Sequence, residues 1–150
     1  MSGKSLNIKN KKARFEYHLF DTYTAGIVLS GTEIKSIRQN KASIVEAYCI
    51  VQNGEVFIRN MFINPYENAS FYKHSPRTDR KLLLNKKEIR KITRFLIDKG
   101  NTLIPLKLFI NEKGWVKVDI ACAKGKKTHD KREDLKEKDD KRALDRAMKK

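Results

Sequence analysis

The sequence predicts a mainly β protein with a few helices, built as a small closed antiparallel barrel of about six strands with a capping helix and a basic C-terminal tail. Three observations predict this architecture. Short apolar runs, several of them alternating with polar residues, recur between residues 15 and 120 with turn-forming residues between them. One segment, residues 85–99, instead repeats its apolar residues at helical spacing. Beyond residue 123 aromatic residues are absent and most residues are charged.

The chain is strongly basic, with a formal net charge of +16 and a pI near 9.9. Residues 124–150 hold 12 Lys and Arg against 7 Asp and Glu, a net charge of +5, and the rest of the chain carries +11. Such a charge strains the compact state through self-repulsion, so a polyanion is the expected partner. We expect three parts: a basic N-terminal arm over residues 1–12, a barrel over residues 13–123 and a tail over residues 124–150.

Two cysteines, Cys49 and Cys122, lie inside apolar runs that are predicted to be strands. Neither belongs to a Cys-x-x-Cys motif or has a histidine at metal-ligand spacing, so we expect reduced core residues, no metal and no other cofactor. The sequence contains no apolar run long enough to span a membrane and no apolar signal-peptide segment near its first residue. We therefore expect a soluble, cytoplasmic protein with no membrane partner.

The first predicted strand alternates over residues 15–19, and a second, more continuous apolar run covers residues 25–29. Gly26 lies within the second run. A glycine inside a strand predicts either a bulge or a close approach of another backbone segment.

A short helix is predicted over residues 30–39, because Ser30 and Glu33 stand at capping-box spacing. Lys35 and Arg38 share one face of this helix. With Lys41, they form either an ordinary solvated surface or a patch that binds phosphates, and the sequence favours neither interpretation.

An Asn-Gly pair at residues 53–54 predicts a two-residue hairpin turn, because both turn positions need positive φ. Apolar runs over residues 44–52 and 55–60 supply its strands, and Phe62-Ile63 is predicted to continue the second. Residues 64–81 form a predicted loop in which aromatic rings are mixed with Arg and Lys. These rings either stack on unpaired bases or fold back over the core as a lid.

The clearest helix is predicted over residues 85–99, with Asn85 and Glu88 at capping-box spacing and Gly100 at the C′ position. We expect its apolar stripe to plug one end of the barrel.

Alternating runs over residues 106–110 and 116–120 predict a second hairpin with a glycine in its loop. Trp115, at the start of the returning strand, is interpreted as a core anchor, with stacking on a base as the alternative. Together the predicted elements favour a barrel of the OB type, an architecture that commonly binds oligonucleotides.

The tail cannot bury enough apolar surface to order itself, so we expect residues 124–150 to be disordered when free. Acid-before-base pairs at i,i+4 spacing nevertheless give the tail a latent helix. A charged partner surface is expected to order it.

Five blocks of the sequence together resemble the bacterial SsrA-binding protein family, also called small protein B. They run in register from about residue 10 to residue 133 and comprise Asn10-Lys11-Lys12-Ala13, Ala25-Gly26-Ile27, Gly31-Thr32-Glu33-Ile34-Lys35-Ser36, Arg80-Lys81-Leu82-Leu83-Leu84 and Lys124-Gly125-Lys126-Lys127 with Asp130-Lys131-Arg132. The family usually has an acidic residue just before the second block, where this chain has Thr24.

The resemblance implies an RNA-binding adaptor and no enzyme. Such a protein would bind the tRNA-like domain of tmRNA and deliver it to stalled ribosomes for trans-translation, with its tail helical in the decoding centre and mRNA channel of the small subunit. Alanyl-tRNA synthetase and elongation factor Tu would act on the same complex. The residues expected to bind tmRNA, including the nearby cation Lys41, are Asn10, Lys11, Lys12, Glu33, Lys35, Arg38, Lys41, Arg80, Lys81, Leu83 and Asn85. Those expected to bind the ribosome are Lys124, Gly125, Lys126, Lys127, His129, Asp130, Lys131 and Arg132.

Local patterns give three of these residues a second interpretation. Glu33 and Asn85 are favoured as helix caps that would affect RNA binding only indirectly. Leu83 is either a core residue, the interpretation favoured on general grounds, or an apolar contact beneath an unstacked base.

The sequence leaves two alternative functions to consider. A generic OB-type RNA-binding or ribosome-associated protein without a rescue role is disfavoured only by the five blocks. A nuclease using His18, His129 or Asp130 is supported by no nucleophile, phosphate-loop or metal-ligand motif.

Overall fold

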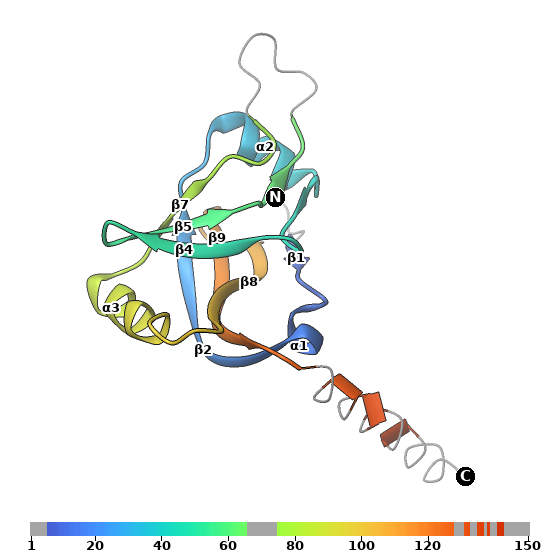
Figure 1. Cartoon of the computed structure of the whole chain (residues 1–150). Helices are drawn as coiled ribbons and strands as arrows, with labels where there is room; N and C mark the ends of the chain where they lie inside the picture. The colour runs from blue at the N-terminus through green and yellow to red at the C-terminus, as the bar shows by residue number, and fades with distance from the viewer. Residues whose placement is uncertain are drawn as a thin grey trace.

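The computed structural model describes residues 6–65 and 75–127, and in the tail residues 131–132, 135–136, 138 and 141–142. Figure 1 shows these parts as a compact β structure with helices at its periphery. In chain order the elements are β1 (Asn7–Lys9), α1 (Ala13–Glu16), β2 (Tyr17–Ile27), α2 (Gly31–Arg38), β3 (Ala42–Ser43), β4 (Tyr48–Gln52), β5 (Glu55–Arg59), β6 (Phe62–Ile63), β7 (Arg80–Leu83), α3 (Lys86–Phe95), β8 (Asn101–Ile110) and β9 (Val116–Gly125).

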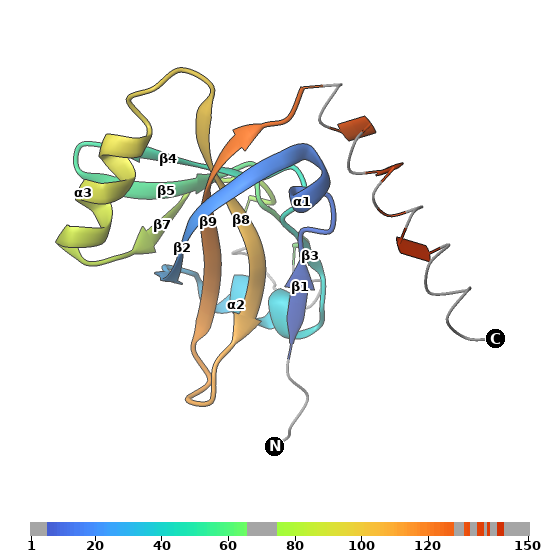
Figure 2. The ribbon, with the colours of Figure 1, turned by 90° about the horizontal axis from the view of Figure 1, so that it is seen from below.

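Six antiparallel strands close into a ring in the order β8, β4, β5, β7, β2 and β9, because β9 pairs again with β8. This arrangement confirms the predicted fold class of a closed, mainly antiparallel sheet with a few helices. Side chains from every strand of the ring fill its interior, and α3 adds the buried Ile92 to the same core. Figure 2 shows α3 and α1 on opposite sides of the ring.

The N-terminal segment is more ordered than the sequence predicts. Residues 7–9, expected in a basic arm, form β1 and pair with β8 from Asn7–Phe109 to Lys9–Lys107. Ile8 is buried and Leu6 packs against the core, so the alternation of these two apolar residues was the signal that the prediction missed.

The two strands predicted over residues 15–19 and 25–29 are one long strand, β2. It pairs with β9 from Tyr17–Gly125 to Gly26–Lys117, with a register irregularity between Leu19 and Thr22. Phe15 and Glu16 belong to α1 instead, where a single helical turn precedes the strand.

Both capping boxes are confirmed. Ser30 Oγ accepts from the Glu33 N–H at 3.3 Å, and Glu33 Oε1 accepts from the Ser30 N–H at 2.9 Å. Asn85 and Glu88 make the same reciprocal pair at the start of α3, with distances of 2.9 and 3.0 Å. Local side-chain chemistry therefore sets where both helices begin.

The Asn53-Gly54 hairpin is also confirmed, with φ of 53° and 74°. The expectation that Phe62-Ile63 would extend β5 is wrong. Asn60 has a φ of 61° and turns the chain, so β6 pairs with β3 in a separate two-stranded sheet.

The second hairpin is longer than predicted, and Trp115 is not a core anchor. The Asn111 side chain accepts from the N–H groups of Lys113 and Trp115 at 3.1 and 2.9 Å, which fixes the turn and leaves the indole 66 % exposed. At its other end β9 includes Lys124 and Gly125, so the sheet extends two residues beyond the expected boundary at residue 123.

Both cysteines are free and buried, as expected. Burial raises the pKa of both thiols, that of Cys122 to about 11 with a smaller contribution from Asp21. Near neutral pH they are therefore protonated core residues.

Within the part of the chain that the structure describes, no helix has the length and apolar character needed to cross a bilayer. The same residues contain no group of three or more His, Cys, Asp or Glu placed to hold a metal ion.

The described tail residues have helical backbone, and the Lys131 N–H donates to the Lys127 carbonyl at 3.2 Å. His129 and Asp130 lie outside the described residues. The change from a disordered to a helical tail stays a prediction.

Candidate RNA interface

The outward surface of β7, β2 and β9 carries a cluster that we call the outer face: Thr24, Gly26, Leu83, Lys117 and Asp119. Register places Gly26 between Leu83 on β7 and Lys117 on β9, and it places Thr24 opposite Asp119. Ala25, Leu82, Val116, Val118 and Ile120, which alternate with them along the strands, are buried in the core. The outer-face side chains therefore point away from the ring.

Leu83 is the apolar centre of the outer face. It is 53 % exposed, so the interpretation of Leu83 as a core residue is wrong. A Cβ at Gly26 would lie 3.3 Å from the Leu83 Cβ, so the close neighbour of this glycine is a side chain and not the backbone segment that was one of the two predicted alternatives. Lys117 on β9 and Lys81 on β7 bring cations to the strands on either side of β2, and the Lys81 ammonium lies 3.2 Å from Glu55 Oε1. An exposed leucine between lysines suits a nucleic acid that presents an unstacked base next to its phosphates.

Replacing Leu83 by alanine is expected to weaken tmRNA binding about tenfold, the usual scale for a central interface side chain. Since Leu83 is exposed, the free energy of unfolding should change by less than about 0.5 kcal/mol. Filter-binding titrations and urea unfolding measure the two effects. Ile97→Ala is the matched control, because Ile97 is 75 % exposed and lies beyond the end of α3. Equal affinity losses for both variants would contradict a specific contact at Leu83.

A carboxylate lies beside Thr24, although residue 24 itself is not acidic. The Thr24 hydroxyl donates to Asp119 Oδ1 at 2.7 Å, and Lys107 Nζ lies 3.9 Å from Asp119 Oδ2. The cross-strand partner thus supplies an acidic group at the place where the sequence departs from the family pattern. Neither Asp119 nor Lys117 was among the predicted site residues, because strand alternation shows that they are exposed but not which neighbouring strand they lie beside.

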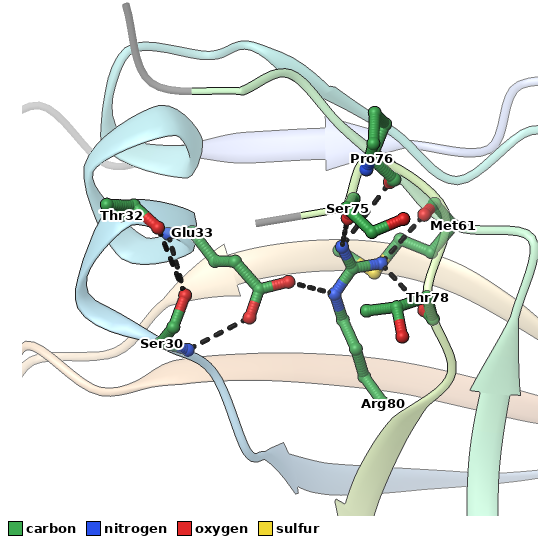
Figure 3. A network of polar contacts seen from close by, with 8 residues as sticks. All are labelled: Ser30, Thr32, Glu33, Met61, Ser75, Pro76, Thr78 and Arg80. Carbon is green, nitrogen blue, oxygen red and sulfur yellow. Dashed lines mark hydrogen bonds and ion pairs between the residues drawn. The ribbon is translucent and has the colours of Figure 1, made fainter. Parts of the chain in front are cut away.

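Two predicted RNA-binding residues, Glu33 and Arg80, form a buried ion pair (Figure 3). Glu33 is 5 % exposed and Arg80 is 3 % exposed, so neither side chain offers surface to a partner. The guanidinium also donates to four backbone carbonyls, those of Met61, Ser75, Pro76 and Thr78, at 2.8–3.3 Å. This pair joins α2 to β7 and to the segment before β7, which makes its effect on RNA binding indirect.

Other predicted residues do reach the surface. Lys35 and Arg38 are exposed on α2, and Lys41 is exposed just after it. Asn85 is exposed and caps α3 through its Oδ1, and its Nδ2 makes no hydrogen bond to any other residue that the structure describes. Asn85 can therefore cap α3 and donate to a partner at once.

A second cluster of predicted residues surrounds α1. Lys11 and Lys12 are exposed, whereas the Asn10 amide is anchored to the Pro105 carbonyl at 3.1 Å. Lys126 belongs to the same cluster, since its backbone N–H donates to Glu16 O at 2.8 Å and its Nζ to Arg14 O at 2.9 Å.

The other residues expected to bind the ribosome lie next to Lys126, at the end of β9 and in the tail. Lys124 and Lys127 are exposed, Gly125 ends β9, and Lys131 places its ammonium 5.6 Å from the centre of the Phe15 ring. Arg132 is exposed.

The two clusters occupy opposite ends of β2. Gly26 and Tyr17 are nine residues apart on this curved strand, a length of about 30 Å along the chain at the usual rise of a β-strand. Figure 1 shows β2 running from α1, where the tail leaves the ring, towards α2. One end of the protein therefore presents the outer face and the other presents Lys11, Lys12 and the root of the tail.

A closed antiparallel ring with basic and apolar groups exposed on its strands defines the class of small nucleic-acid-binding β proteins. Comparison with known proteins then identifies the family. The profile of the family described as "SmpB protein" matches residues 7–150. The chain belongs to this family, and the resemblance found in the sequence is confirmed.

Relatives match over nearly the whole chain. The SsrA-binding protein of Bacteroides thetaiotaomicron is 57 % identical over 149 residues, which is 99 % of each chain. That of Trichodesmium erythraeum is 48 % identical over 148 residues, covering 98 % of this chain and 94 % of the relative. A solved chain described as "tmRNA-SmpB: a journey to the center of the bacterial ribosome" superposes with a TM-score of 0.69 at 41 % identity, covering 82 % of this chain and 86 % of its own.

Proposed function

We propose that this protein is an adaptor without catalytic activity that binds the tRNA-like domain of tmRNA and delivers it to stalled ribosomes in trans-translation. The observation that carries the proposal is that cations are exposed both on the folded ring and at the root of the tail, in a protein of net charge +16. Family membership supplies the identity of the two RNA partners.

The outer face is part of the proposed tmRNA site. The other exposed residues assigned to this site are Lys35, Arg38, Lys41 and Asn85, together with Asn10, Lys11 and Lys12 beside α1. Lys117 of the outer face and the nearby Lys81 bind phosphates, and Leu83 packs against an exposed base. Glu33 and Arg80 act by holding α2 and β7 in place.

The tail, from Lys124 at the end of β9 onward, is the proposed ribosome site. Lys124, Lys127, Lys131 and Arg132, together with His129 and Asp130, contact the decoding centre and the mRNA channel, where the tail becomes helical. RNA phosphates that neutralise its cations hold the tail in the helical conformation there. Alanyl-tRNA synthetase and elongation factor Tu act on the same cytoplasmic complex, at parts of the tmRNA that this protein leaves uncovered.

Purification of the protein from its own cell, followed by sequencing of the bound RNA, tests the proposal directly. We expect tmRNA to be the most enriched species, with ribosomal RNA recovered through the tail. Enrichment of many unrelated RNAs to the same extent would instead support a generic RNA-binding protein.

Salt dependence tests the outer face. Each phosphate neutralised by the protein should add roughly −0.7 to −0.9 to the slope of log K against log salt concentration. Lys117→Gln is expected to reduce this slope by about one, whereas Lys99→Gln, which removes an exposed cation beyond α3, should leave it unchanged. A flat salt response of the unmodified protein would contradict phosphate binding altogether.

A further inference from the structure

The single tryptophan of the chain, Trp115, is exposed at the hairpin between β8 and β9. Its indole is 66 % exposed, although tryptophan side chains are highly buried on average. Figure 2 shows this hairpin, at the bottom of the view, extending beyond the neighbouring strands. Tryptophan is enriched at interfaces, because it offers a large flat apolar surface together with one polar N–H.

The backbone of Trp115 is held in place by the turn. Its N–H donates to Asn111 Oδ1 and its carbonyl accepts from the Asn111 N–H, both at 2.9 Å. Gly114 completes the turn with a φ of 84°, and its N–H donates to the Asn111 carbonyl at 3.0 Å. An exposed side chain on a fixed backbone loses little conformational entropy when a partner binds it.

Trp115 lies on the same side of the sheet as the outer face. Val116 and Val118 are buried in the core, so the side chains of Trp115 and Lys117, which alternate with them, point outward. Register places Lys117 opposite Gly26 of the outer face. The indole therefore extends the outer face towards the hairpin.

Val28 extends the outer face beyond the end of β2. Its N–H donates to the Lys81 carbonyl at 3.0 Å, so the pairing with β7 continues to this residue. Because Ile27 packs against the core, Val28 points outward, and its side chain is 51 % exposed. Leu83, Val28 and Trp115 thus expose apolar surface on one side of the sheet. Exposed apolar side chains gathered on one face, unlike scattered ones, indicate a binding surface.

The charges near Trp115 favour RNA as the partner. Lys113 is exposed in the turn and Lys117 follows on β9, and neither ammonium forms an ion pair with another described residue. An aromatic ring with a cation on each side along the chain suits a nucleobase whose neighbouring phosphates meet the two cations. Glu112 is the one acidic residue of the turn, and it leaves the hairpin between residues 111 and 117 with a net charge of +1.

We propose that Trp115 stacks on an unpaired nucleobase of the tRNA-like domain of tmRNA, while Lys113 and Lys117 bind the phosphates next to that base. Every base has a π face, so the indole recognises an unpaired base whatever its identity. Leu83 and Trp115 are separated by two strand spacings, about 10 Å, so they contact different bases. The proposal rests on the tmRNA-binding function proposed above and adds to it a stacking site at the hairpin.

The fluorescence of the unmodified full chain tests this site directly. Because the chain contains one tryptophan, the indole emission reports on Trp115 alone. Titration with a transcript of the tRNA-like domain should quench this emission saturably. Acrylamide, a neutral quencher, should reach the indole in the free protein and lose access to it in the complex, because the base covers the ring.

Variants of Trp115 separate stacking from a general apolar contact. Trp115→Ala is expected to weaken binding of the tRNA-like domain about tenfold, within the range of one base–aromatic stack. Trp115→Phe keeps a ring and should bind within about threefold of the unmodified protein, whereas Trp115→Leu keeps apolar bulk without a π face and should lose as much affinity as the alanine variant. Ile97→Ala is the control, and it should change nothing, because Ile97 is an exposed apolar residue beyond α3. The urea midpoint should stay the same for every variant, since the substituted side chains are exposed.

Equal affinities of the leucine and phenylalanine variants would show a contact that needs no ring and would overturn the proposal. Protection of the indole by ribosomes but not by the tRNA-like domain would overturn it as well, because Trp115 would then serve another partner. If gel shifts show that the tRNA-like domain binds while acrylamide still reaches the indole, the stacking site is wrong and the adaptor function stands. If the tRNA-like domain does not bind the unmodified protein at all, the adaptor function is wrong and the stacking site with it.

Discussion

Deletion of residues 128–150 is expected to leave tmRNA affinity within about twofold, a change of less than about 0.5 kcal/mol, and to abolish tagging on stalled ribosomes. The cut follows Lys127 because Lys124 and Gly125 belong to β9 and Lys126 is bonded to residues around α1. Loss of the second of two linked binding sites removes a gain in overall affinity of about 10²–10⁴. Gel-shift titrations and a reconstituted tagging reaction measure the two outcomes.

A tail of the same composition in scrambled order is the matched control. It keeps the charge and removes the i,i+4 pairing of acids with bases. We expect it to restore little tagging. Full activity with the scrambled tail would show that charge alone suffices, and loss of tmRNA binding on deletion would refute the assignment of the two RNAs to two surfaces.

Arg80→Ala is expected to destabilise the protein by about 3–5 kcal/mol, because it leaves the buried Glu33 carboxylate unpaired. At about 2–4 °C per kcal/mol for a chain of this size, the melting temperature should fall by ~10 °C. The substitution also removes the donor to four backbone carbonyls. Thermal melting followed by circular dichroism gives the result.

The exposed pair Arg59–Asp79 supplies the control for this experiment. Its nitrogen–oxygen distance is 3.1 Å and its side chains are 40 % and 49 % exposed, so Arg59→Ala should lower the free energy of unfolding far less than Arg80→Ala. If both substitutions lower the free energy of unfolding equally, burial does not determine the strength of the ion pair between Arg80 and Glu33. Where Arg80→Ala remains folded, tmRNA affinity should fall only as far as the folded fraction does. A larger loss would mean that Arg80 contacts RNA directly.

The sequence was sufficient wherever the structure depends on neighbouring residues. The capping boxes at Ser30 and Asn85 and the turn at residues 53–54 are local hydrogen-bond and φ requirements, and all three occur as predicted. The closed sheet also followed from strand spacing. Asn60 shows the limit of this approach, because a single left-handed residue redirected the chain and moved β6 to another sheet.

The candidate site was harder to predict, because exposure depends on contacts between distant parts of the chain. Arg80 is buried through a partner 47 residues away, whereas Leu83 and Trp115, both apolar, are exposed. Hydrophobicity alone predicts that Arg80 is exposed and that Leu83 and Trp115 are buried. Asp119 became a candidate only when register placed it opposite Thr24.

The contact of Lys126 with Arg14 and Glu16 determines where the C-terminal segment departs from the body. Because β2 and β9 are paired from Tyr17 to Gly26, the distance between that departure point and Gly26 is set by the sheet. Two molecules bound at the two ends of these strands are therefore kept at one distance from each other. A two-residue insertion in both strands would lengthen that distance by roughly 7 Å. Such a protein should bind each molecule with normal affinity and fail to place the two molecules correctly relative to each other.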